Sequence, residues 1–84
     1  MIYFIKSESG HVKIGYTKNV ENRIESFSTA HGGMGKLLFT IPGNYELEKE
    51  LHEKYKKYHY SNEWFHIDGE LEEYITSNIN KKVI

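Results

Sequence analysis

The chain has 84 residues, of which 38% are hydrophobic and 14% aromatic. This suffices for one packed core, so we predict a single domain over residues 1–84 with a polar tail after about residue 76. It contains no cysteine, which excludes disulfides and thiolate metal sites, and its apolar runs are far shorter than the ~20 residues of a membrane span, so we expect a cytoplasmic protein without membrane contact. Eleven basic residues against twelve acidic ones give a net charge of −1, which excludes a general electrostatic attraction to nucleic acid.

A β-hairpin is predicted at the start of the chain. Residues 2–6 (IYFIK) and 11–16 (HVKIGY) are rich in β-branched and aromatic side chains, and residues 7–10 (SESG) between them favour a turn. The second strand alternates between two faces, one with Val12, Ile14 and Tyr16 and the other with His11, Lys13 and Gly15. One face can therefore pack while the other carries polar chemistry.

The middle of the chain predicts a helix, a strand and a second helix. Apolar residues at helical spacing indicate a helix over about residues 20–30, with Asn19 as its N-cap. Residues 36–41 (KLLFTI) are too apolar for an exposed loop and end before a proline–glycine pair, so we expect a third strand, central in the sheet. Asn44 can then cap a second helix over about residues 45–59.

The last part of the chain closes the fold. Residues 63–67 (EWFHI) form either a short strand or an aromatic plug, and a last helix runs from Gly69 to about Ile79. The apolar residues expected to face the core from the last two helices are Leu47, Leu51, Tyr55 and Tyr58 in the first and Leu71, Tyr74 and Ile75 in the second. The order ββαβα, then the aromatic segment and a C-terminal helix, predicts an α+β fold with a small three-stranded antiparallel or mixed sheet flanked by helices.

Polar residues from several of these elements are predicted to share one site. Tyr3 and residues 13–15 (KIG) lie on neighbouring strands, where Tyr3 either packs or belongs to a site and the glycine would let a ligand approach the backbone. Arg23 falls at the margin of the first helix's buried stripe, where a guanidinium suits a phosphate. Glu48 and His52, spaced i, i+4, suit a half-buried metal-binding or acid–base pair, although an ordinary surface contact has the same spacing.

Five segments carry a resemblance to a known family: Ile2-Tyr3, Lys13-Ile14-Gly15-Tyr16-Thr17, Asn22-Arg23-Ile24, Glu48-x-x-Leu51-His52 and Glu63-Trp64-Phe65. Together they resemble the GIY-YIG nuclease superfamily, in the small branch common in phages and bacteria whose second signature reads KIG. The resemblance covers about residues 2–75. It implies a three-stranded antiparallel sheet surrounded by helices, and hydrolysis of a DNA phosphodiester bond by water with a single divalent ion, Mg²⁺ or Mn²⁺.

The resemblance also implies roles for single residues. Tyr3 matches the tyrosine that contacts or activates the attacking water, Arg23 the arginine that holds the scissile phosphate, and Glu48 the glutamate that binds the metal. Gly15 matches the glycine of the second signature, and we expect it to contact substrate together with the adjacent Tyr16. DNA is thus the expected partner.

The sequence departs from the superfamily pattern at Lys13, which stands where the second signature has tyrosine. Its ammonium can stabilise a developing negative charge, or it can mark a domain that binds without cutting. We therefore carry two hypotheses. The first is a metal-dependent DNA endonuclease with Tyr3, Lys13, Arg23 and His52 as catalytic residues, and the second is a catalytically inactive DNA-binding or protein-interaction module.

Overall fold

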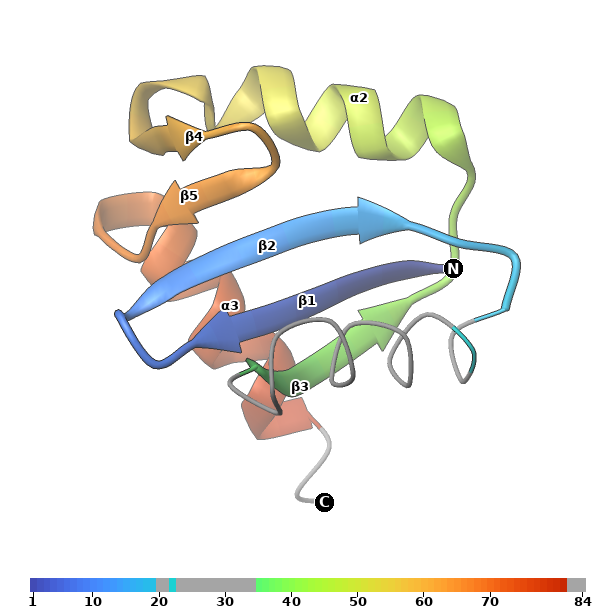
Figure 1. The fold of residues 1–84 in the computed structure, drawn as a ribbon, viewed down its shortest axis with the longest axis horizontal. Helices are drawn as coiled ribbons and strands as arrows, with labels where there is room; N and C mark the ends of the chain where they lie inside the picture. The colour runs from blue at the N-terminus through green and yellow to red at the C-terminus, as the bar shows by residue number, and fades with distance from the viewer. Residues whose placement is uncertain (20–21, 23–34, 82–84) are drawn as a thin grey trace.

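The computed structural model describes residues 1–19, 22 and 35–81 and forms an α+β fold (Figure 1). The strands it describes form one antiparallel five-stranded sheet in the order β3-β1-β2-β5-β4. The strands are β1 (Ile2–Ser7), β2 (His11–Tyr16), β3 (Gly35–Ile41), β4 (His59–Ser61) and β5 (Trp64–His66). The remaining elements are helix α2 (Tyr45–Lys54), the short 3-10 helix η1 (Lys56–Tyr58) and helix α3 (Gly69–Lys81).

The predicted hairpin is confirmed. β1 pairs with β2 from Ile2 opposite Tyr16 to Lys6 opposite Val12, and the turn closes where the Gly10 N–H donates to the Ser7 carbonyl at 3.1 Å. Gly10 has a φ of 87°, a backbone conformation that favours glycine. The turn residues therefore set the register that decides which side chains share a face.

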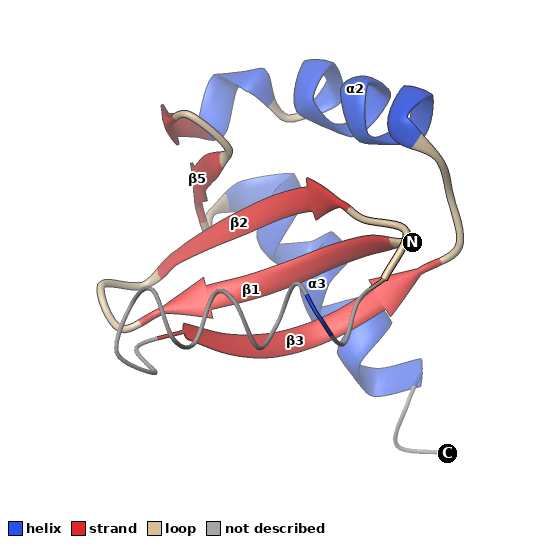
Figure 2. Ribbon diagram, turned by 45° about the vertical axis from the view of Figure 1, so that its right-hand side comes forward, coloured by secondary structure: helices blue, strands red, loops and turns tan. Residues whose placement is uncertain are grey.

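One face of the sheet carries the main core. Side chains of alternate strand residues meet Leu51 of α2, Tyr55 at its C-cap, and Leu71 and Ile75 of α3, and all of these are buried. The strand residues in this cluster are Ile2, Phe4, Val12, Ile14, Phe39 and Phe65. Figure 2 shows α3 behind β1 and β3, and α2 along the outer side of β2. The inward stripes predicted for both helices are thus confirmed at their centres.

The opposite face of the sheet is also packed at its middle. Tyr3 and Ile5 are buried there, at 2% and 1% exposure, and Trp64 of β5 packs against them. Lys13 and Gly15 belong to this face, because they alternate with the core residues of β2 and lie opposite Ile5 and Tyr3 in the register. The two faces of the hairpin differ as the alternation predicted.

Three expectations for the elements are corrected. The sheet has five strands rather than three, because residues 59–61 pair with residues 64–66. Of the two readings of residues 63–67, a short strand or an aromatic plug, the short strand is confirmed. The helix expected to reach residue 59 ends at Lys54, since the chain must become extended for that pairing. β3 is an edge of the described sheet and not a central strand, and Leu37 is 37% exposed.

Two further observations concern the helices. The helix predicted over residues 20–30 lies outside the described residues, apart from residue 22, whose N–H donates to Asn19 Oδ1 at 3.1 Å as to an N-cap. In the described chain, neither α2 nor α3 has the length and apolar character needed to cross a bilayer.

Candidate functional site

The candidate site lies where β2 leaves its neighbour β5. β5 pairs only with residues 11–13 of β2, so the outer edge of β2 beyond that point has no strand partner within the described sheet. Helix α2 covers this edge, and His52 Nε2 lies 2.8 Å from the Ile14 carbonyl oxygen. Because a carbonyl only accepts, Nε2 must carry the proton and donate it. The Ile14 N–H donates to the Glu63 carbonyl at 3.1 Å, so both outward backbone groups of Ile14 are satisfied.

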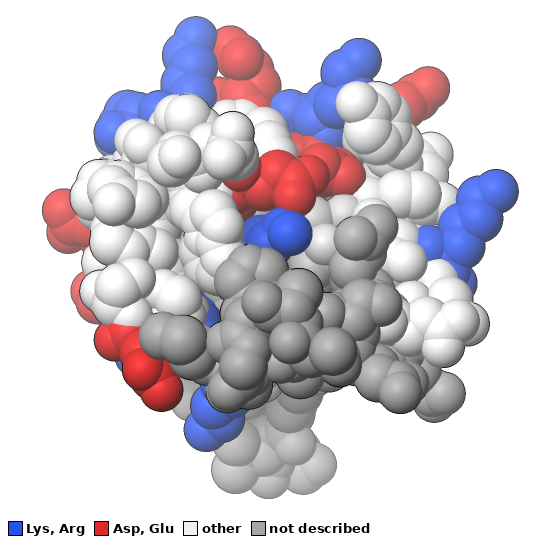
Figure 3. Space-filling view, in the orientation of Figure 1, with Lys and Arg blue, Asp and Glu red and all other residues white. Residues whose placement is uncertain are grey.

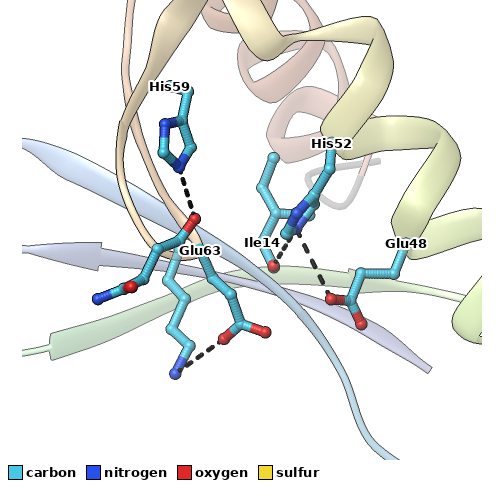
Figure 4. A network of polar contacts seen from close by, with 7 residues as sticks. Ile14, Glu48, His52, His59 and Glu63 are labelled. Carbon is cyan, nitrogen blue, oxygen red and sulfur yellow. Dashed lines mark hydrogen bonds and ion pairs between the residues drawn. The ribbon is translucent and has the colours of Figure 1, made fainter.

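Four ionisable side chains gather at this edge. Figure 3 shows acidic and basic side chains meeting near the centre of the face it draws. Lys13 Nζ lies 3.4 Å from Glu63 Oε2, and His52 Nε2 lies 3.7 Å from Glu48 Oε1. In Figure 4 the carboxylates of Glu48 and Glu63 point toward one another. The cluster of Lys13, Glu48, His52 and Glu63, hereafter the edge cluster, therefore joins β2, α2 and the start of β5.

Glu48 is the deepest member of the edge cluster. Glu48 is 7% exposed, whereas the side chain of Glu63 is 43% exposed. Burial raises the pKa of Glu48, and the neighbouring Glu63 carboxyl raises it further, while His52 and Lys13 act in the opposite direction. The charged form of Glu48 is thus disfavoured unless a cation lies beside it.

The edge cluster has donors that suit a hard divalent ion. Mg²⁺ takes oxygen ligands, keeps several waters and is commonly held by one or two carboxylates. Glu48 and Glu63 are such a pair, and their mutual repulsion would be relieved by a cation between them. Among the described residues no group of three acidic or histidine side chains is arranged as a ready-made metal cage. The residues present therefore fit an ion that retains water, not an ion enclosed by protein.

Tyr3 lies against Gly15 in the centre of the hairpin. The two residues are directly opposed across β1 and β2, and a Cβ added to Gly15 would overlap Cζ and Oη of the tyrosine. The tyrosine ring therefore fills the space that the sequence pattern assigned to an approaching ligand. This gives Gly15 a packing reason, and its contact with substrate stays a prediction.

Two other predicted site residues remain, Tyr16 and Arg23. Tyr16 belongs to the face of Val12 and Ile14 and packs against the main core, on the opposite face of β2 from Lys13. Arg23 lies outside the described residues, and its role as the phosphate-binding residue remains a prediction.

Sequence reasoning missed Glu63 as a member of the site. The motif Glu63-Trp64-Phe65 carries part of the resemblance, but the sequence pattern assigns Glu63 no role in the site. The available signal was the position of an acid immediately before a strand that returns to the hairpin. The pairing of Lys13 with Trp64 brings Glu63 beside Lys13, and no local pattern predicts that pairing.

The fold and the edge cluster define a small α+β domain with a half-buried acidic site at a strand edge. The chain matches the T5orf172 domain over residues 1–82 and belongs to that family, which lies in the GIY-YIG/HNH-like nuclease-related superfamily. The resemblance found in the sequence is confirmed at that level, and the chain is a nuclease-like or DNA-binding module. No curated protein and no solved structure matches the chain.

Proposed function

We propose that the protein is a divalent-metal-dependent DNA endonuclease that hydrolyses a phosphodiester bond. The observation that carries the proposal is the side chain of Glu48, almost fully buried yet facing a second carboxylate at the edge of β2 that α2 covers. An arrangement of two acids that disfavours ionisation costs stability, and such strained groups concentrate at functional sites. Membership in a nuclease-related superfamily agrees with this reading.

Glu48 is the residue proposed to hold Mg²⁺ or Mn²⁺, and Glu63 is placed to add a second oxygen directly or through water. A bound ion would polarise a phosphoryl oxygen and make a coordinated water more acidic. The two carboxylates, Glu48 and Glu63, would attract the cation to the position where the negative charge of the phosphate must be neutralised.

The other members of the edge cluster have distinct proposed roles. Lys13 lies beside Glu63, from which its flexible side chain can turn its ammonium toward a phosphate oxygen. The Nε2–H of His52 donates a hydrogen bond to the Ile14 carbonyl, so this N–H is not available to a substrate. We therefore propose that His52 is a positioning residue that fixes α2 and with it Glu48. Tyr3 is proposed to orient the attacking water and Arg23 to bind the scissile phosphate, as the superfamily resemblance implies.

A nicking assay on supercoiled plasmid tests the proposal. Wild type should convert supercoiled DNA to open circles with Mg²⁺ or Mn²⁺, and Glu48→Gln should lose this activity by at least about a hundredfold, because the amide keeps the shape but removes the charged ligand. Glu50→Gln is the matched control, since Glu50 is an exposed glutamate on the same helix. Equal cutting by wild type and Glu48→Gln across both metals would refute metal-dependent catalysis at this site.

A non-catalytic DNA-binding module is the second candidate, and one contact favours it. Lys13 replaces the signature tyrosine and already pairs with Glu63 at 3.4 Å, as a structural ion pair would. This candidate predicts that wild type binds DNA but leaves plasmid, single-stranded and branched DNA uncut in every metal. The same assay, run beside a binding measurement, therefore decides between the two functions.

A further inference from the structure

Three aromatic rings meet on the surface at the end of the sheet formed by β2, β5 and β4. His11 of β2 stacks on Tyr60 of β4 with ring centroids 4.0 Å apart and planes inclined by 12°. His66 of β5 lies 5.0 Å from His11 and 5.1 Å from Tyr60, tilted against both. Each of three strands thus contributes one ring to this cluster, hereafter the ring cluster.

The ring cluster is not part of the core. Tyr60 is 55% exposed although one face of its ring is covered by His11, so much of the rest of its ring must face solvent. His66 is exposed as well. Neither ring belongs to either cluster of buried residues. A stacked pair of rings with an open outer face is a surface that another flat ring can extend.

The base of the ring cluster is held in place by the hairpin turn. Ser9 Oγ lies 2.8 Å from His11 Nδ1, and Ser7 Oγ lies 2.7 Å from Ser9 Oγ. The His11 N–H also donates to Ser7 Oγ at 3.2 Å. The imidazole under Tyr60 is therefore oriented before any ligand arrives, which reduces the ordering cost of binding.

We propose that the ring cluster is a stacking platform for an unpaired nucleobase, and that the substrate is DNA with a single-stranded segment. This rests on the proposed function and names its substrate class. The net charge of −1 leaves little general attraction to phosphate, so contacts with bases must contribute to binding. Stacking on aromatic side chains supplies such contacts without sequence preference and needs a base that is not held in a duplex.

The position of the ring cluster agrees with that substrate. His11 and Lys13 lie on the same face of β2, two residues apart, which at ~3.3 Å per residue places their backbones roughly 7 Å from one another. His66 and Trp64 stand opposite them on β5. One strand of DNA could thus lay a base on Tyr60 while a nearby phosphate lies at the edge cluster.

Fluorescence anisotropy with a labelled oligodeoxythymidylate of about twenty nucleotides, in EDTA, tests the platform without any cutting. Tyr60→Ala should weaken binding by about tenfold, the effect of losing one stacked base, whereas Tyr60→Phe should stay within about twofold because it keeps the ring. Tyr45→Ala is the matched control, since Tyr45 is 58% exposed but begins α2, and it should bind as wild type does. Binding to duplex DNA should change less in Tyr60→Ala than binding to the single strand.

The platform would be overturned if wild type failed to bind the single strand, or if Tyr60→Ala bound it like wild type. A tighter Tyr60-dependent complex with an oligouridylate of the same length would also overturn it, because RNA would then be the partner. Loss in Tyr45→Ala equal to that in Tyr60→Ala would also refute a specific role. Failure of the nuclease proposal appears separately, as uncut plasmid with single-strand binding intact. Failure of the platform appears as Tyr60→Ala that binds and cuts like wild type.

Discussion

The burial of Glu48 by the packing of α2 opposes the ionisation of its carboxyl group. Its backbone belongs to α2 beside the buried Leu51, so the packing that fixes the helix also removes the carboxylate from water. Burial and Glu63 both raise the pKa of Glu48, which makes the ionised form costly in the folded protein. A residue chosen for stability alone would be neutral here, and the proposed binding of a metal ion would account for an acid at this position.

The raised pKa of Glu48 predicts how stability depends on pH. Between the ordinary value of 4.5 and the higher folded-state pKa, the native protein binds more protons than the unfolded chain, so the free energy of unfolding falls as pH rises through that window. Glu48→Gln lacks this loss, and its melting temperature should exceed that of wild type increasingly from pH 4.5 upward and then level off. Thermal melts of both proteins in EDTA across this range measure the difference, and a gap that is independent of pH would contradict the assignment.

The same pair of proteins reports on metal binding. A cation that binds only the native state raises the melting temperature by mass action. At neutral pH, Mg²⁺ or Mn²⁺ should therefore stabilise wild type and leave Glu48→Gln nearly unchanged. The exposed-site variant Glu50→Gln should respond as wild type does, and an equal response from all three would place the ion elsewhere.

Gly15 and Tyr3 are directly opposed in the hairpin, and the lack of space between them predicts the effect of one added methyl group. Gly15→Ala would drive its Cβ into the buried Tyr3 ring and should destabilise the protein by about 1–3 kcal/mol in a urea melt, the usual cost of overpacking. In a Tyr3→Leu background the same substitution should cost clearly less, because the overlapping atoms are gone. Additive effects of the two changes would show that the cost of Gly15→Ala does not come from the Tyr3 ring.

At the scale of elements, a polar contact at the outer edge of β2 adds to the apolar packing of Leu51 that holds α2 against the sheet. His52 donates to the Ile14 carbonyl and also meets the Phe65 ring edge-on, with centroids 5.0 Å apart. The backbone groups at an unpaired strand edge need hydrogen-bond partners, and here a helix side chain is the partner of the Ile14 carbonyl. The position of Glu48 one turn earlier on α2 thus depends on His52.

His52→Ala should therefore reduce the free energy of unfolding by about 1–3 kcal/mol, because the Ile14 carbonyl loses its partner. Chemical denaturation measures the loss, and Glu50→Ala on the exposed side of α2 should change stability by less than about 0.5 kcal/mol. If His52 only positions α2, His52→Ala should also weaken the metal-induced rise in melting temperature. A variant as stable as the control would show that the helix is held by its apolar stripe alone.

Elements with strong local signals could be predicted from the sequence. The hairpin, the N-cap Asn44, whose Oδ1 accepts from the Leu47 N–H at 3.0 Å, and the helix that starts at Gly69 all follow from turn residues, capping and periodicity. The end of α2 could not, because Tyr55 and Tyr58 continue a helical spacing that the pairing of β4 with β5 overrides. Long-range pairing also decides that β3 is at an edge, and no property of its own sequence reports that.

The candidate site likewise combines positions that local periodicity predicts with contacts that depend on long-range strand pairing. Alternation along β1 and β2 put Tyr3 and Lys13 on one face, and helical phase put Glu48 beside His52. Local periodicity could not predict that Glu63 reaches Lys13 and faces Glu48, because that contact needs β5 to return to β2. Nor did it indicate that His52 would bind a backbone carbonyl, since the exposed edge of β2 exists only in the assembled sheet.

At the scale of the whole molecule, the charges are balanced and interspersed. Acidic and basic side chains lie close to one another over the coloured part of Figure 3, and three lysines, Lys13, Lys56 and Lys57, have carboxylate oxygens within 4 Å. Such surface pairs contribute little to stability, but each lowers the net positive charge offered to DNA. For the proposed binding to DNA, we therefore expect a few local contacts and not a broad basic surface.

This balance predicts a weak dependence of DNA binding on salt. Each phosphate contact contributes about 0.7 to the slope of log affinity against log salt for single strands and about 0.9 for duplex DNA, so a few contacts give a slope of magnitude about 3 or less. Anisotropy titrations of single-stranded DNA in EDTA, repeated from low to moderate NaCl concentrations, measure the slope. The double variant Glu53→Gln, Glu70→Gln removes the carboxylates paired with Lys56 and Lys57 and changes the net charge from −1 to +1, so its slope should be steeper if those lysines then reach the DNA. A wild-type slope of magnitude about 6 or more would contradict this view, because it would require the basic residues to act together as one phosphate-binding surface.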